Sequence, residues 1–218
     1  MSNIQIWYWP FGGRTAVARL ALAHAGIPCE FNGINSFEQW EEAKKNADLF
    51  PTEDIPVMRV DGRLITESAA ITQFAGVAAN LMPEGPVGYA VVAELLALSE
   101  EVLSGFWGTC YYKTSDMMNP GKSEEELKAL RDGPYKETLC FYATRVNAIV
   151  ELNREKSEKH VYGDKLTMAD LVVWNFSKMV NEEDCYAERV GAIKRVADMV
   201  NSISPNEEFV KLRDQFNS

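Results

Sequence analysis

Residues 4–24 read IQIWYWPFGGRTAVARLALAH, and this stretch changes from a strand pattern to a helix pattern across one glycine-rich turn. The alternation over residues 4–8 is typical of a β-strand, and the PFGG segment supplies a turn before a helix predicted at 14–24. Gly26 and Pro28 give the usual signals for the end of that helix. One face of the helix carries Val17, Leu20 and Ala21. The sequence therefore begins with a strand, a tight turn and a helix.

The residues that follow predict three more strands and a second helix. A short strand is expected at 29–34, and Asp61 with Gly62 marks a hairpin of two antiparallel strands at 56–66. After the hairpin, the spacing of an amphipathic helix is carried by Ile71, Phe74, Ala75 and Ala78. Because a βαβ crossover joins parallel strands, this order implies a mixed four-stranded sheet with helices packed on it.

The second half of the chain gives no further strand signal. The segment 80–88 holds two prolines and two glycines and is expected to be a linker. Helical spacing is carried by Val91, Leu95, Val102 and Phe106, and then by Tyr135, Leu139, Tyr142, Val146 and Ile149. Ser123 with Glu126, and Thr167 with Asp170, are signatures of helix N-termini. We therefore predict a first domain at 1–79, a linker at 80–88 and an all-helical second domain at 89–218.

Composition narrows the classes of function. The formal net charge of −10 repels phosphate backbones and anionic lipid, so we expect neither nucleic acid nor a membrane as partner. The N-terminus shows no basic region followed by an apolar run, and the four cysteines are widely spaced. We therefore expect a cytoplasmic protein in a reducing compartment. The two histidines, His24 and His160, lie far apart in the sequence, so no metal site is predicted.

Several of these pieces form a combination that packing alone does not require: Tyr8 at a strand end, Gly13 and Arg14 at a helix start, Ile55-Pro56 before the hairpin, and Glu67 with Ser68 after it. The sequence resembles the cytosolic glutathione S-transferases, and among them the sigma class, which includes haematopoietic-type prostaglandin D synthases. The likeness is carried by WYWPFGGRTAVARLALAHAGI at 7–27, IPVMRVDGRLITESAAI at 55–71 and GDKLTMADL at 163–171. This resemblance implies a thioredoxin-like N-terminal domain that binds glutathione, followed by an all-helical C-terminal domain.

By this resemblance, Tyr8 is a catalytic residue whose hydroxyl donates a hydrogen bond to the thiolate of glutathione, the nucleophile. Arg14 matches an arginine that contacts glutathione and helps to orient the tyrosine, and Trp9 occupies a position that is often aromatic in the family. From the residues alone, Tyr8 also fits an ordinary strand residue, Arg14 a solvated arginine and Trp9 simple packing. Tyr111 and Tyr112 are the fallback candidates for the catalytic tyrosine.

The resemblance also implies which residues hold the backbone and the γ-glutamyl end of glutathione. Ile55 is expected to bind the cysteine backbone by strand addition, helped by a cis bond at Pro56. Ser68 is expected to hold the γ-glutamyl carboxylate at a helix start, while Glu67 accepts from its ammonium group. Sigma-class relatives usually carry glutamine in place of Glu67. A strand-entry proline and a helix cap are the alternative interpretations.

By the same resemblance, further positions match residues that hold the glycine end of glutathione or that reach the glutathione bound to the neighbouring subunit. Trp40, through its indole N–H, and Lys44, as a carboxylate partner, line up with residues at the glycine end. Asp54 stands where a lysine is common. Glu100 and Glu101 match an acidic pair that reaches the ligand of the neighbouring subunit, which implies a homodimer. A solvated charge for Lys44 and a solvated helix face for the acidic pair are equally consistent with the sequence.

A second pocket for the electrophile is expected from an aromatic-rich group: Phe11, Leu103, Phe106, Trp107, Tyr111 and Tyr112. Core packing is the alternative for about half of them. The predicted function is a glutathione transferase of the detoxification kind, in which the thiolate attacks an electrophilic carbon of small hydrophobic substrates. Glutathione is the expected co-substrate, and no metal is required. A glutathione-dependent isomerase and a non-catalytic structural or interaction protein of the crystallin type stay open as alternatives.

Overall fold

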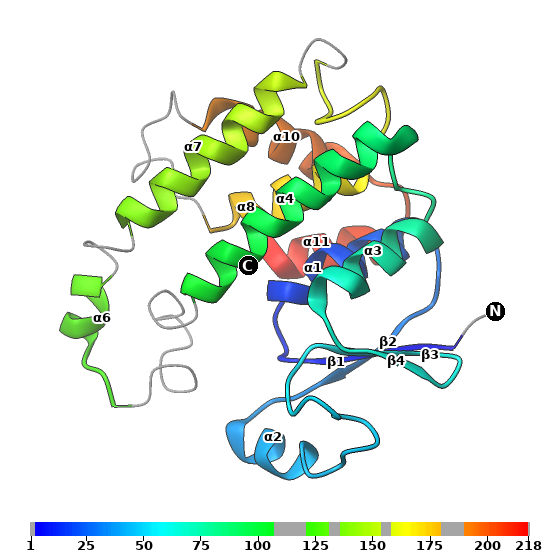
Figure 1. The fold of residues 1–218 in the computed structure, drawn as a ribbon, viewed down its shortest axis with the longest axis vertical. Helices are drawn as coiled ribbons and strands as arrows, with labels where there is room; N and C mark the ends of the chain where they lie inside the picture. The colour runs from blue at the N-terminus through cyan, green and yellow to red at the C-terminus, as the bar shows by residue number, and fades with distance from the viewer. Residues whose placement is uncertain (1–2, 107–120, 131–135, 154–157, 180–189, 218) are drawn as a thin grey trace. The chain divides into compact units, whose positions relative to one another are not determined.

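The computed structural model of the chain describes residues 3–106, 121–130, 136–153, 158–179 and 190–217 (Figure 1). Their internal contacts divide the chain into two units, 1–82 with 203–218, and 83–202. The domain limits predicted from the sequence stay a prediction. The division by contacts groups 203–218 with the first unit because the C-terminal helix packs on the first helix.

The first unit is built on a four-stranded sheet. Its strands are β1 (Ile4–Tyr8), β2 (Glu30–Gly33), β3 (Val57–Val60) and β4 (Arg63–Ile65). They lie in the order β2-β1-β3-β4, with β1 parallel to β2 and antiparallel to β3, and β3 antiparallel to β4. Asp61 (φ 48°) and Gly62 (φ 89°) take the left-handed backbone that a two-residue hairpin needs. The predicted mixed sheet and its hairpin are therefore confirmed.

Helices lie on both sides of this sheet, with α1 and α3 on one side and α2 on the other (Figure 1). They are η1 (Gly13–Thr15, a short 3-10 turn), α1 (Ala16–His24), α2 (Phe37–Ala43) and α3 (Ser68–Ala78). At the end of α1, Gly26 N–H donates to the Ala23 carbonyl at 3.0 Å and Ile27 N–H to the Leu22 carbonyl at 2.9 Å. This pair of bonds satisfies carbonyls that the helix leaves open, so the predicted stop at Gly26 is confirmed.

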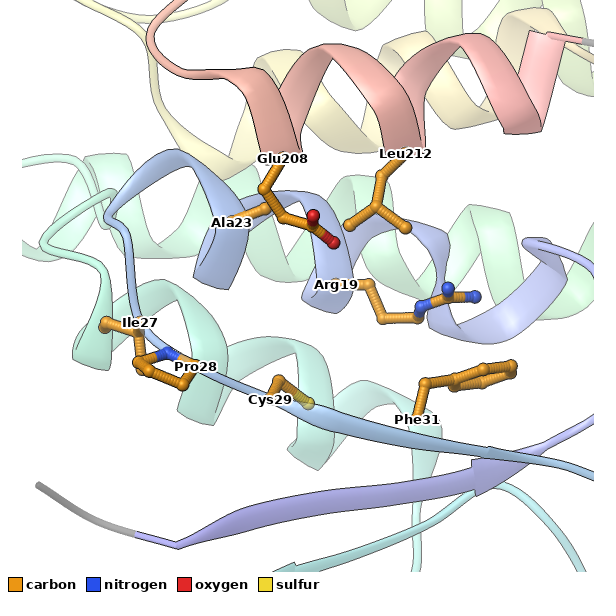
Figure 2. A pocket seen from close by; sticks show the side chains of 8 residues that line it. All are labelled: Arg19, Ala23, Ile27, Pro28, Cys29, Phe31, Glu208 and Leu212. Atoms are coloured by element: carbon orange, nitrogen blue, oxygen red, sulfur yellow. The ribbon is translucent and has the colours of Figure 1, made fainter.

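The C-terminal helix α11 (Glu207–Asn217) belongs to the first unit and packs along α1 (Figure 2). Asn206 joins the two helices, because its Oδ1 accepts from Phe209 N–H at 2.9 Å while its Nδ2 donates to the Ala23 carbonyl at 2.7 Å. One side chain thus caps the start of α11 and gives the Ala23 carbonyl at the end of α1 a second donor, besides Gly26 N–H. The Phe209 side chain is fully buried, and its ring meets His24 edge-on at 5.8 Å between centroids.

The described residues of the second unit are helical and contain no strand. The helices are α4 (Gly85–Phe106), α6 (Glu124–Leu130), α7 (Lys136–Leu152), α8 (Met168–Ser177) and α10 (Gly191–Ser202). Both α7 and α8 pack against α4 and α10. The predicted helical second domain is confirmed in this part of the chain. None of the described helices is long and apolar enough to cross a membrane.

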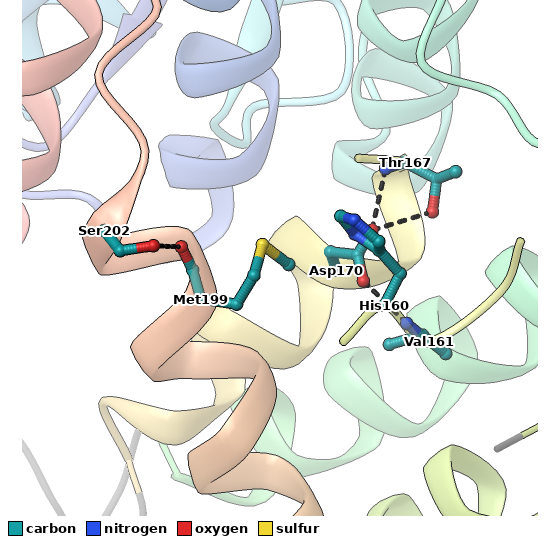
Figure 3. Close-up of polar contacts among 6 residues, drawn as sticks. All are labelled: His160, Val161, Thr167, Asp170, Met199 and Ser202. Carbon is teal, nitrogen blue, oxygen red and sulfur yellow. Dashed lines mark hydrogen bonds and ion pairs between the residues drawn. The ribbon is translucent and has the colours of Figure 1, made fainter. Parts of the chain in front are cut away.

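Both predicted capping signatures form, and they differ in burial. On the surface, Ser123 N–H donates to the Glu126 carboxylate at 2.7 Å, and Glu126 N–H donates back to Ser123 Oγ at 3.2 Å. Asp170 is instead fully buried, and its Oδ2 accepts from Thr167 N–H at 2.7 Å (Figure 3). Its Oδ1 accepts from Val161 N–H, also at 2.7 Å. The buried aspartate therefore ties the start of α8 to the chain segment before it.

Candidate active site

Tyr8 ends β1 and is fully buried, with its hydroxyl at the start of the first helix. Arg14 N–H donates to the hydroxyl oxygen at 3.4 Å, and the Tyr8 ring meets Phe11 edge-on at 5.7 Å between centroids. Gly13 has a φ of +43°, and a Cβ there would lie 3.0 Å from the Tyr8 hydroxyl and 2.9 Å from the Phe11 ring. The glycine therefore allows the backbone to approach the phenol closely.

The sheet register places the Ile55-Pro56 pair next to Tyr8. Trp7 pairs with Val57 across the antiparallel strands, so β3 begins beside the end of β1. The Ile55-Pro56 peptide bond is cis. Helix α3 packs on both η1 and β3. The fold thus brings the end of β1, the start of β3 and the first turn of the chain's first helix to one end of the sheet.

The two predicted residues at the start of α3 differ in exposure. Ser68 is the first residue of the helix and only 6% exposed, whereas Glu67 precedes it with extended backbone and an exposed side chain. Just before β3, Ile55 N–H donates to the carboxylate of Asp54 at 2.8 Å. The backbone group that the sequence assigned to glutathione therefore has an internal acceptor.

Trp40 and Lys44 lie on and directly after α2, which is on the side of the sheet opposite to α1 (Figure 1). Trp40 is buried, and its ring meets Phe50 edge-on at 5.2 Å. Lys44 is half-buried and forms an ion pair with Glu41 at 2.7 Å. Trp9 is buried just after β1. The glutathione contacts expected of these residues stay predictions.

The other predicted residues lie in the second unit or outside the described residues. Glu100 is half-buried and Glu101 exposed on α4, where Glu101 accepts a hydrogen bond from the Tyr142 hydroxyl. That hydrogen bond raises the pKa of Tyr142 above its ordinary value. Leu103 is buried, and Phe106 ends α4. Trp107, Tyr111 and Tyr112 lie outside the described residues, so the second pocket, like the homodimer, stays a prediction.

Sequence patterns did not predict what Gly13 and Asp54 do. The second glycine of PFGG was a usable signal, because it exceeds what a turn alone requires and here makes room for the Tyr8 hydroxyl. An acidic residue directly before Ile55 was a weaker signal, since its hydrogen bond to the next N–H depends on the local backbone. Among the described residues, no group of three or more histidine, cysteine, aspartate or glutamate side chains is placed to hold a metal ion.

The mixed sheet, the cis-proline before its third strand and the helical second unit define a thioredoxin-like protein with an added helical domain. Residues 8–81 match the family model described as "Glutathione S-transferase, N-terminal domain", and residues 107–211 match "Glutathione S-transferase, C-terminal domain". The chain belongs to the glutathione S-transferase family, and the resemblance found in its sequence is confirmed. Membership implies glutathione as co-substrate.

Individual relatives span nearly the whole chain. Glutathione S-transferase 3 of Caenorhabditis elegans is 26% identical over 218 residues, which cover 99% of each chain. A crystal structure of a nematode-specific transferase from C. elegans has a TM-score of 0.77 at 20% identity and covers 97% of this chain and 95% of its own. A sigma-class transferase from Fasciola hepatica has a TM-score of 0.73 at 21% identity, with 97% of both chains covered. These two structures support the fold.

Proposed function

We propose that this protein is a glutathione transferase in which Tyr8 stabilises the thiolate of glutathione for attack on an electrophilic carbon. The observation that carries this proposal is the placement of the Tyr8 hydroxyl against Gly13 and the N–H of Arg14. Because the hydroxyl oxygen accepts from Arg14 N–H, its own O–H becomes a stronger donor toward a sulfur anion. Each unit by which the thiol pKa falls corresponds to about 1.4 kcal/mol in favour of the thiolate.

The reaction follows from that stabilised charge. The thiol of glutathione loses its proton to solvent, and the sulfur lone pair forms a C–S bond with the electrophilic carbon. With an aryl chloride, the C–Cl bond then breaks and chloride leaves with the electron pair. The same thiolate also serves a glutathione-dependent isomerase, in which it adds to the substrate and leaves again. Small hydrophobic electrophiles fit the aromatic composition predicted for the second pocket.

Ser68 and Ile55 are the residues we propose to hold the tripeptide. Ser68 begins α3, so its N–H and hydroxyl are suited to a carboxylate at a helix N-terminus. The edge beside the Ile55-Pro56 bond is suited to an extended peptide backbone. In this proposal the carbonyl of glutathione's cysteine replaces the Asp54 carboxylate as the acceptor for Ile55 N–H. Asp54 therefore competes with the ligand.

The decisive experiment compares wild-type protein with Tyr8→Phe. Glutathione is titrated into each protein while thiolate absorbance in the ultraviolet and conjugation of an aryl chloride are followed. We expect glutathione to bind both proteins, and both signals to fall by about 10²-fold in Tyr8→Phe because the hydroxyl donor is lost. The exposed Tyr89, changed to Phe in the same way, is the matched control and should behave as wild type.

The other outcomes separate the alternatives. Binding without thiolate in wild type and variant alike points to a non-catalytic protein that keeps the fold. Full turnover in Tyr8→Phe assigns the activation to another group, and Tyr111 and Tyr112 become the next variants. Thiolate without aryl conjugation, together with isomerisation of an unsaturated carbonyl substrate, points to the isomerase.

A second experiment tests the competition by Asp54. Asp54→Ala frees Ile55 N–H and removes a negative charge close to a ligand that carries two carboxylates. We expect glutathione to bind at least about threefold more tightly by calorimetry, which lies in the range of about 0.5–1.5 kcal/mol for the net contribution of one hydrogen bond. The control, Asp48→Ala, removes an exposed acid from the same segment and should leave affinity unchanged. Weaker binding in Asp54→Ala would show that the carboxylate helps to hold the ligand.

A further inference from the structure

A cavity of about 260 Å³ lies in the first unit between α1, β2 and α11 (Figure 2). Its volume is slightly below the range of about 300–1,000 Å³ that is usual for pockets holding drug-sized ligands, so only a small molecule fits. The apolar part of its lining is made by Ala23, Ile27, Pro28 and Leu212. The cavity uses neither Tyr8 nor any other residue of the candidate active site.

A buried cation lines this cavity. Arg19 of α1 is only 7% exposed, and its guanidinium lies 3.7 Å from the centroid of the Phe31 ring and 4.8 Å from that of Phe216. Its Nη1 atom is buried and has no hydrogen-bond partner among the described residues. Burial lowers the pKa of Arg19 to about 10. The aromatic faces offset only part of the cost of removing a charge from water, because they accept no conventional hydrogen bond.

Glu208 is the acidic group that attracts the charge of Arg19, but it does so without a direct ion pair among the described residues. Glu208 lines the cavity and is exposed, and its carboxylate points toward the Arg19 side chain (Figure 2), but no ion pair within 4.0 Å joins the two residues in the described part of the chain. Burial raises the pKa of the Cys29 thiol to about 11, so this neighbour is neutral. The carboxylate of Glu30 is engaged on the surface by the side-chain amide of Gln5 at 2.7 Å. The cavity therefore combines an apolar lining with a buried cation that has no direct ion pair within the part of the chain that the structure describes.

We propose that this cavity binds a small monocarboxylate with a short apolar tail. The carboxylate lies against the guanidinium of Arg19, which lines the cavity, and forms a charge-assisted hydrogen bond with it. The tail contacts the apolar lining residues Ala23, Ile27 and Leu212. Glu208 at the rim repels a second negative group, which excludes dicarboxylates and favours a single anionic end. The proposal is independent of the activity proposed for Tyr8.

The test is a titration of the full chain with hexanoate, with hexanol as a neutral probe of the same length. Calorimetry gives the affinity, and amide shifts in NMR spectra show the location. We expect saturable binding of hexanoate with shifts at Cys29, Phe31 and Leu212, and binding of hexanol at least about tenfold weaker, since a hydrogen bond to a charged group is lost. Equal binding of both probes, or shifts elsewhere in the chain, would overturn the proposal.

Two variants make the test specific. Arg19→Met keeps an apolar side chain between the aromatic rings and should weaken hexanoate at least about tenfold without weakening hexanol. Glu208→Gln changes an exposed rim residue that does not hold the fold together, and should tighten hexanoate by about threefold. If Arg19→Met does not fold, Glu208→Gln still decides, because unchanged or weaker affinity in that variant contradicts a carboxylate placed beside Arg19.

Discussion

The two ends of α1 each rely on a glycine with left-handed backbone, but the two glycines do different work. At the first end, Gly13 (φ +43°) lies where a Cβ would meet the Tyr8 hydroxyl at 3.0 Å. After the last turn, Gly26 (φ +65°) has nothing within 4 Å of its Cβ position. Gly26 therefore serves only to end the helix, whereas Gly13 also makes room for a functional group.

Helix α11 reaches both ends of α1 and contacts them differently. Near the last turn of α1, Asn206 donates to the Ala23 carbonyl and Phe209 packs on His24. Near the first turn, the Phe216 ring lies 3.1 Å from the Cβ position of Gly12 and also stacks over Arg19. The comparison shows that the last turn of α1 is fixed by hydrogen bonds and burial. The first turn instead holds Gly13 and the N–H of Arg14 against the Tyr8 hydroxyl.

The largest expected effect comes from removing the main packing contact at the last turn. Phe209→Ala should reduce the free energy of unfolding by about 3–5 kcal/mol, because a fully buried ring is lost and a cavity remains. Urea unfolding measures this. Phe37→Ala, at a ring that is 54% exposed on α2, should change stability by about 0.5 kcal/mol or less. Equal effects of the two changes would show that α11 contributes little to the first unit.

The next effect separates the two roles of Asn206. Asn206→Ala removes the cap of α11 and the donor to α1, and should cost about 2 kcal/mol. Asn206→Asp keeps the acceptor for Phe209 N–H but loses the donor to the Ala23 carbonyl, so an intermediate loss is expected in urea unfolding. A stability of Asn206→Asp at or below that of Asn206→Ala would mean that the bond to α1 carries the whole effect.

Local patterns predicted the elements around both ends of α1. The strand of Tyr8, the stop at Gly26 and the mixed sheet follow from periodicity, turn residues and the rule for parallel crossovers. The capping signature of Thr167 and Asp170 could also be predicted from the sequence. The bond from Val161 N–H to that buried aspartate was not, because it joins residues outside the motif.

Contacts between distant segments could not be predicted. Arg19 sits between alanine and leucine in an apolar run, and its burial depends on Phe31 and on Phe216, which is almost 200 positions later in the chain. Periodicity gives no information on which helix covers which, so the packing of α11 on α1 could not be predicted from the sequence. Tyr8 at the end of a strand and Ser68 at the start of a helix were predicted from the sequence, whereas the bond from Ile55 N–H to Asp54 needed coordinates.

A smaller effect compares the two glycines directly. Gly13→Ala and Gly26→Ala both impose left-handed strain of about 1–2 kcal/mol in urea unfolding, and Gly13→Ala should cost more because its methyl group also overlaps neighbouring atoms. Only Gly13→Ala places a methyl group against the Tyr8 hydroxyl and the Phe11 ring, so only this variant should also lose turnover with glutathione, by about tenfold or more. Similar turnover in the two variants would show that the close approach of the Gly13 backbone to the Tyr8 hydroxyl does not affect turnover.

The smallest effect is a pH dependence at the last turn. Burial lowers the pKa of His24 below its usual value of 6.5, so the unfolded chain binds this proton more readily than the folded protein. The contribution of His24 to stability is therefore complete above pH 6.5 and is lost as the pH falls through the folded pKa. His24→Leu cannot gain a proton, so wild type should lose more stability than the variant between about pH 7.5 and about pH 5.5 in urea unfolding. A parallel loss in both proteins would mean that His24 titrates alike folded and unfolded, and that Phe209 packs equally well on the imidazolium.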